Sequence, residues 1–164
     1  MAVDMFLNLA DKKIEGESQD DAHKGEIDIL SWTWGAAQSG TGHLGGGSGS
    51  GKVAVQDLTV VKYVDKSSPN LFAHCCRGDH LPKAVLTVRK AGGAKPVEYI
   101  KITLDKVFIT SCQISGTSDQ DRITETLTLN FTKAKFEYVP QKEDGSALPT
   151  ITKGWDIASN KEWS

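Results

Sequence analysis

Residues Glu26–Val64 read EIDILSWTW, then GAAQSGTGHLGGGSGSG, then KVAVQDLTVVKYV. Two alternating, β-prone segments are thus joined by the loop Gly35–Gly51, which has seventeen residues, eight of them glycine. Ordering such a loop costs conformational entropy, and a compact domain seldom keeps a long structureless loop without a use. We therefore expect the loop to become ordered against a neighbouring subunit, which indicates an assembly protein rather than an enzyme.

Strands dominate the rest of the chain. Alternating apolar residues, many of them β-branched or aromatic, predict strands over Val3–Leu9, Lys83–Ala91, Val97–Leu104, Lys106–Ser115 after a bend, Arg122–Tyr138 and Trp155–Ile157. Along the longest of these, the apolar parity changes between Phe131 and Ala134. A slip of one residue exchanges the two faces and can come from a β-bulge. The pattern predicts a curled, barrel-like sheet, or a sheet that uses both faces.

One helix is predicted between Ser68 and Gly78. Ser68 is a favourable cap, Pro69 suits the first helical position, and Gly78 suits the left-handed residue that ends many helices. Its apolar face, expected to pack on the sheet, consists of Leu71, Phe72, Cys75 and Cys76.

The composition limits the classes of function. The chain has 164 residues, which suits one domain over residues 1–164, and a formal net charge of −2 with both signs interleaved. No basic patch indicates nucleic-acid binding, and no apolar run is long enough to cross a membrane. The start of the chain lacks the features of a signal peptide, so we expect folding in the cytoplasm.

The three cysteines, Cys75, Cys76 and Cys112, do not form a disulfide framework, because their number is odd and two are adjacent. With His74 and His80 they give H-C-C-x₃-H, which contains ligands that zinc prefers. Adjacent residues on a helix project about 100° apart, however. We predict core cysteines and no metal site, and leave open whether the thiols are ever oxidised outside the cytoplasm.

Two further motifs suggest a nucleotide-binding site and a catalytic site, but each lacks features that such a site needs. Gly46–Val53 (GGSGSGKV) fits most of a phosphate-binding loop, but Val53 replaces the Ser or Thr that binds Mg²⁺, and a strand follows instead of a helix. Glu17, Ser18, Asp20 and His23 are close in sequence, but a catalytic triad is defined by geometry. We therefore predict neither a catalytic residue nor a cofactor.

Small hydroxylated residues alternate with large apolar ones in two segments. Trp32 and Trp34 alternate with Ser31 and Thr33. In the same way, Leu127, Leu129 and Phe131 alternate with Thr126, Thr128, Asn130 and Thr132. This pattern is typical of the solvent side of an antiparallel sheet. It would also suit the lining of a pore through which cargo passes.

The order of motifs resembles one known family. Residues Gly16–Gly35 follow GES-x-D-x-x-HKG-x-I-x-I-x-x-W-x-WG. Later motifs are DKSSPNL (65–71), RKAGG (89–93), VEYIKITL (97–104), LTLNF (127–131) and GWD (154–156). Together they resemble the haemolysin-coregulated protein (Hcp) family of type VI secretion over nearly the whole chain.

The resemblance implies a mainly β fold, a two-sheet curled β-barrel with one short α-helix packed alongside. It implies a homohexameric ring that stacks into tubes and has no enzymatic activity. The expected partners are a contractile sheath, a spike protein of the VgrG type and type VI effectors carried in the lumen. Export would not need a signal peptide, and neither membrane insertion nor nucleic-acid binding is expected.

The resemblance also implies two sets of functional residues. The inter-subunit loop would comprise Gly42, His43, Leu44, Gly45, Gly46 and Gly47. The lumen lining that meets effectors would include Thr33, Ser115 and Thr117. The alternative is a monomeric β-barrel or β-sandwich module that binds a small ligand.

Overall fold

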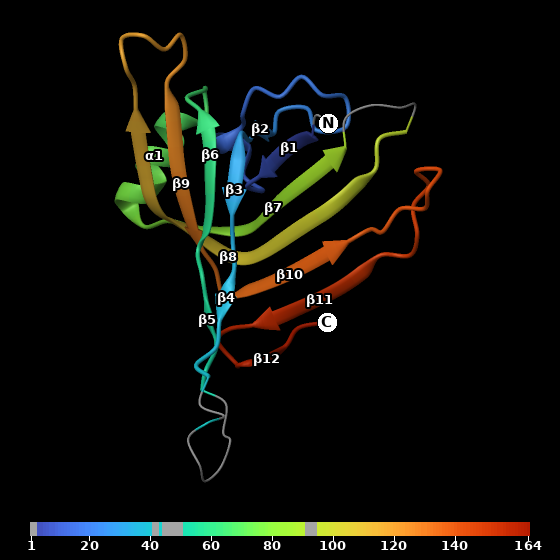
Figure 1. Ribbon diagram of the computed structural model, residues 1–164. Helices are drawn as coiled ribbons and strands as arrows, with labels where there is room; N and C mark the ends of the chain where they lie inside the picture. The colour runs from blue at the N-terminus through green and yellow to red at the C-terminus, as the bar shows by residue number, and fades with distance from the viewer. Residues whose placement is uncertain (1–2, 41–42, 44–50, 91–94) are drawn as a thin grey trace.

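The computed structural model describes residues 3–40, 43, 51–90 and 95–164, and Figure 1 shows their arrangement. In these ranges there are one α-helix, α1 (Ser68–Arg77), one 3-10 turn (Lys12–Ile14) and twelve strands. The strands are β1 (Val3–Asn8), β2 (Ile27–Asp28), β3 (Ser31–Thr33), β4 (Ala36–Ala37), β5 (Ala54–Val55), β6 (Leu58–Tyr63), β7 (His80–Lys90), β8 (Glu98–Ser115), β9 (Thr124–Asn130), β10 (Lys133–Tyr138), β11 (Ile151–Asp156) and β12 (Lys161–Glu162).

Ten strands form one large sheet with two branches that share β8. One branch runs β2–β1–β7–β8–β10–β11–β12, and the other runs β8–β9–β6–β3. β8 serves both because it bends at Lys106, whose φ is 51°. The bend expected near this position is confirmed.

The segment between β2 and β3 ties the two branches together on the side away from β8. The Ile29 N–H donates to the Met5 carbonyl of β1 at 2.9 Å, and the Leu30 N–H donates to the Val61 carbonyl of β6 at 2.7 Å. The strands therefore wrap around one core, which includes Leu7, Leu58, Leu86, Leu104 and Leu127.

The predicted helix is confirmed, but its predicted face is partly wrong. Gly78 has φ 69° and ends the helix, while Ser67 rather than Ser68 is the N-terminal cap. Leu71 is buried, whereas Phe72 is 57% exposed and Cys76 is exposed. The reason is the helical period, since residues three or four apart share a face. The face that packs on the sheet carries Ser68, Leu71, His74 and Cys75.

The strand expected over Arg122–Tyr138 is two strands, β9 and β10. Between them the Thr132 N–H donates to the Asp105 carbonyl at 3.0 Å. At this point the chain leaves the second half of β8 and begins to pair with its first half. The parity change after Phe131 is therefore a change of partner within one curled sheet.

The predicted fold class is confirmed, because the described chain is mainly β with one helix packed at its side. The second sheet is the pair of β4 and β5, which forms the root of the glycine-rich loop. Within the described ranges, no helix has the length and apolar character needed to cross a membrane.

Candidate functional site, a hydroxylated sheet face

The branch of β3, β6, β9 and the second half of β8 presents one face of small polar side chains. Cross-strand register places Thr33, Thr59, Thr128 and Ser111 in one row. The next row contains Ser31, Val61, Thr126 and Gln113, and the last contains Tyr63, Thr124 and Ser115. All are half-buried or exposed. We call these eleven residues the hydroxylated face.

Two of the three residues predicted for the lumen lie on this face. Thr33 and Ser115 occupy its first and last strands, β3 and β8. Thr117 lies beyond β8 in the turn, where its hydroxyl donates to Asp119. The hydroxylated face itself contains no ionisable group except the phenol of Tyr63.

Sequence reasoning missed Thr59, Ser111 and Gln113 as members of the face. The signal for Thr59 was hidden because β6 carries valine outward at Val61 and lysine inward at Lys62. The signal for Ser111 was hidden by an irregularity in the pairing of β8 with β9 between Ile109 and Ser111. An extra residue of this kind shifts every later side chain to the other face.

Charged side chains lie at both ends of the hydroxylated face. Asp57 lies just before β6 and accepts hydrogen bonds from Thr110 Oγ1 and Asn130 Nδ2, both at 2.9 Å. At the other end of β6, the Arg122 guanidinium lies 3.7 Å from the centroid of the Tyr63 ring, a cation–π contact. Between the ends, hydroxyl groups can exchange hydrogen bonds with water or a passing chain, and no fixed charge holds a ligand.

The opposite side of the same strands buries an ion pair beneath α1. Lys62 and Glu125 are both 0% exposed, and Lys62 Nζ lies 3.6 Å from Glu125 Oε1. The ammonium also donates to Asp65 Oδ1 at 3.1 Å and to Ser68 Oγ at 3.2 Å. This cluster joins the start of the helix to β6 and β9.

Cys112 lies on this buried side. Burial, together with the Glu125 carboxylate, raises the pKa of the Cys112 thiol to about 11. The thiol therefore stays protonated and weakly nucleophilic at neutral pH. Of the other predicted core cysteines, Cys75 packs against the core and Cys76 is exposed.

The polar segment around His23 is built into the fold. His23 Nδ1 lies 2.8 Å from Glu26 Oε2 and Nε2 lies 2.6 Å from Glu98 Oε1, and the ring stacks on Phe6. Burial opposes the imidazolium charge, but the hydrogen bonds that the ring donates to both carboxylates outweigh it and raise the pKa of His23. We call His23, Glu26, Glu98 and Phe6 the His23 clasp.

Asp20 of the same segment is bound to Arg89 of β7. The hydrogen bond from the guanidinium lowers the pKa of Asp20 to about 2. Arg89 also donates to Asp4 Oδ2 at 3.1 Å. Asp20 and His23 thus bind the segment to two different strands, so their contacts stabilise the fold.

The remaining predicted residues are placed as follows. Of the inter-subunit loop, His43 is exposed, and Gly42, Leu44, Gly45, Gly46 and Gly47 lie outside the described residues. His74 Nδ1 lies 2.9 Å from the Asn70 carbonyl, and His80 is exposed. Across the part of the chain that the structure describes, no three His, Cys, Asp or Glu side chains are grouped so that they could hold a metal ion.

Comparisons with known proteins agree on one family. The family model described as "Type VI secretion system effector, Hcp" matches residues 6–138. The curated protein Hcp1 of Pseudomonas aeruginosa is 51% identical over 161 residues, which cover 98% of each chain. The crystal structure of Hcp1 from Salmonella typhimurium is 43% identical with a TM-score of 0.80, over 99% of this chain and 100% of that one. A structure described as a type six secretion system protein is 33% identical with a TM-score of 0.91, over the same shares.

Proposed function

The chain belongs to the Hcp family and is a structural subunit of the type VI secretion tube, and from this premise we propose how its copies join and what the hydroxylated face does. Six copies close into a ring, the hydroxylated faces line the lumen, and rings stack into the secreted tube. Effectors rest in the lumen, while the sheath and a spike protein contact the assembled tube.

The open edges of one sheet carry this proposal. Within the described residues, no strand pairs with the second edge of β3, or with that of β8 from Ile109 to Ser115. These are the two outer edges of the branch β3–β6–β9–β8. An open edge offers unpaired N–H and C=O groups to another chain. Pairing of β3 in one copy with β8 in the next is a head-to-tail contact, which closes a ring when the rotation fits.

The chemistry of the hydroxylated face suits a lumen. Continuing the sheet from copy to copy keeps all hydroxylated faces on the same side. Neutral hydroxyl groups give a wet surface on which an effector can form exchangeable hydrogen bonds. We expect Thr33 and Ser115 to contact effectors directly. We expect Thr117 to contact them from the turn that follows β8.

The glycine-rich loop is the second contact between copies. Figure 1 shows its root, β4 and β5, projecting away from the body of the sheet. We expect Gly42–Gly47 to lie against a neighbouring subunit, which supplies the order that the loop lacks the side chains to provide for itself.

Light scattering and electron microscopy of the purified protein test assembly. We expect rings whose mass is well above the single-chain mass of 17.7 kDa. Replacement of Gly42–Gly47 by bulky β-branched residues should weaken assembly and leave folded monomers. A protein that remains a monomer at every concentration would instead fit the small-ligand module.

Effector retention tests the lumen. Thr33→Gln, Ser115→Gln and Thr117→Gln should each reduce the amount of effector that co-purifies with intact rings. Thr152→Gln on β11, an exposed threonine outside the hydroxylated face, is the matched control. Unchanged retention in all three variants would contradict the lumen assignment.

A further inference from the structure

Large apolar side chains are exposed along one side of β10 and β11. The register pairs Ala134 with Trp155, Phe136 with Lys153, and Tyr138 with Ile151, so these six share a face. Phe136, Tyr138 and Ile151 are 38%, 42% and 57% exposed. We call these three residues the apolar stripe. Adjacent exposed apolar side chains of this size are typical of a surface that binds another protein.

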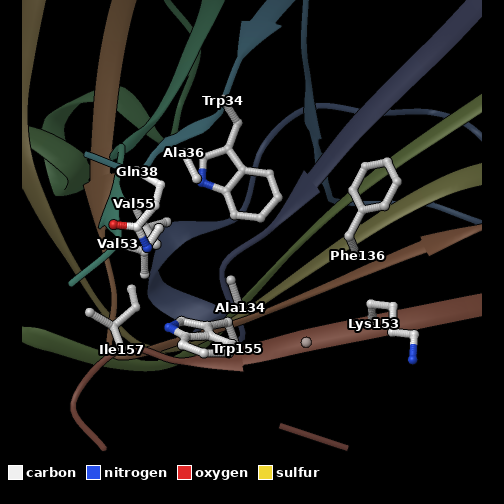
Figure 2. Close-up of a pocket in the computed structure, with 11 residues that line it drawn as sticks. Trp34, Ala36, Gln38, Val53, Val55, Ala134, Phe136, Lys153, Trp155 and Ile157 are labelled. Carbon is white, nitrogen blue, oxygen red and sulfur yellow. The ribbon is translucent and has the colours of Figure 1, made fainter. Parts of the chain in front are cut away.

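A pocket of about 390 Å³ opens at the inner end of the apolar stripe, as Figure 2 shows. Trp34 and Phe136 face each other across it with ring centroids 6.4 Å apart, and Trp155 lies opposite Trp34. Val53 and Val55, from the root of the glycine-rich loop, complete the wall. Trp155 Nε1 is buried and has no acceptor among the described residues.

A second group of exposed apolar residues lies at the far end of the molecule. Val64, Ile114 and Ile123 are all exposed. Ile114 lies in the Lys62–Glu125 row of the buried side, and Val64 and Ile123 lie just past it. The Val64 N–H donates to the Ile123 carbonyl at 2.9 Å. We call these three residues the apolar tip. Figure 1 shows the β8–β9 tip and the β10–β11 pair on opposite sides of the molecule.

We infer that the apolar stripe and its pocket receive the apolar tip of a second copy of this chain. The inference rests on the proposed ring, whose head-to-tail contacts need two unlike surfaces on opposite sides. The two patches adjoin the two open edges, because Trp34 follows β3 directly and Ile114 lies on β8. Ile114 pairs with Glu125 in a row that lies toward the Ser31 end of β3 and away from Trp34. The contact therefore requires that the β8 of the next copy is shifted along β3 toward Trp34, as the tilted strands of a closed sheet allow.

The charges around the two patches are complementary. Lys153 lines the pocket beside Phe136. The turn next to the apolar tip carries Asp119 and Asp121, whereas the cation of that turn, Arg122, is already stacked on Tyr63. An ammonium beside an apolar stripe and carboxylates beside an apolar tip steer the two surfaces toward each other.

The first experiment compares two charge insertions of equal exposure. Ile151→Asp lies in the apolar stripe, and Phe72→Asp lies on α1, outside both patches, at the same 57% exposure. Circular dichroism should show both variants folded. By light scattering, Ile151→Asp should raise the protein concentration needed for ring formation at least tenfold, and Phe72→Asp should leave it unchanged.

The possible results distinguish failure of the apolar contact from failure of the proposed ring. If the natural protein and Ile151→Asp form rings at the same protein concentration, the apolar contact is overturned and the proposed function stands. Equal loss in Phe72→Asp would also overturn it, because the effect would then not be specific to the stripe. Absence of rings in the natural sequence would refute the proposed function itself.

The second experiment identifies the partner surface. Replacement of Ile151 by the photoreactive amino acid p-benzoylphenylalanine should give inter-chain adducts on irradiation of assembled protein. Peptide mapping should place them within residues 114–123 or at Val64 of the other copy. The same amino acid at Phe72 should give no adduct in that range. Adducts elsewhere on the second copy, or no inter-chain adducts, would overturn the pairing of stripe with tip.

Discussion

The sheet of β3, β6, β9 and the second half of β8 has two faces of opposite character. On the hydroxylated face, small neutral side chains meet solvent. On the buried side, Leu58, Val60, Leu127 and Leu129 join the core, and Lys62 pairs with Glu125 beneath α1. Successive residues of one strand thus have separate tasks, with stability on one side and the proposed contact with cargo on the other. Substitutions at neighbouring positions should therefore differ in effect by several kcal/mol.

The largest effect is expected at the buried ion pair. Lys62→Met leaves the Glu125 carboxylate buried without a cation, and breaking a buried pair in this way costs about 3–5 kcal/mol. Urea-induced unfolding measures the change in the free energy of unfolding. The double variant Lys62→Met/Glu125→Leu should recover much of the loss, because the fully buried carboxylate is then removed and Asp65, which also loses the ammonium, still accepts a hydrogen bond from the Ser67 N–H. A single variant within about 1 kcal/mol of the natural protein would contradict the role of the pair.

A smaller loss is expected at Gly16, where the chain approaches itself. A Cβ at Gly16 would lie 2.5 Å from the Glu26 carbonyl oxygen and 2.7 Å from Ile27 Cα, both backbone atoms. Gly16→Ala should therefore cost about 1–3 kcal/mol through overpacking. The control is Gly116→Ala at the tip of the sheet, where the nearest atom is a side-chain carbon of Ile123 at 3.3 Å. Equal losses in the two variants would show that backbone proximity does not explain the effect.

The third prediction concerns pH and the His23 clasp. The pKa of His23 is raised in the folded chain, so its stabilising contribution is complete below the unfolded value of about 6.5 and is lost as pH rises through the folded pKa. His23→Gln should destabilise the protein by about 1–2 kcal/mol near pH 6, since it removes a charge-assisted hydrogen bond. The difference from the natural protein should shrink toward pH 9. Unfolding curves that differ equally at both pH values would contradict a charged clasp.

The sequence is sufficient to predict most helices and strands, but not which strands pair with each other. Pro69 and Gly78 determine the helix by local chemistry, and the hairpin of β7 and β8 follows from alternation around a turn. The break at Thr132 is not local, because it depends on a hydrogen bond to Asp105, far away in sequence. Alternation alone could therefore show a change of face there but not its cause.

The candidate site was predictable only where a strand alternates strictly. Thr33 follows from its place between two tryptophans. The burial of Lys62 could not be predicted, because a lysine suggests exposure and only the folded chain shows the carboxylates that pair with it. The position of Thr117 beyond the end of β8 could not be predicted for a similar reason, since that end is determined by pairing with β9 rather than by composition.

The smallest effect is expected in the middle of the hydroxylated face, at Thr126. Its neighbours along the chain, Glu125 and Leu127, are fully buried, whereas Thr126 is half-buried on the opposite side. Thr126→Val keeps the shape and removes the hydroxyl, so the free energy of unfolding should change by no more than about 0.5 kcal/mol. Leu127→Ala, one residue away, should lose about 2–5 kcal/mol by leaving a cavity. If Thr126→Val instead unfolds as easily as Leu127→Ala, the hydroxyl is structural and the two faces do not divide stability from function. If stability holds while effector retention by intact rings falls, the hydroxyl is used by the cargo, and the contrast between the faces becomes a functional one.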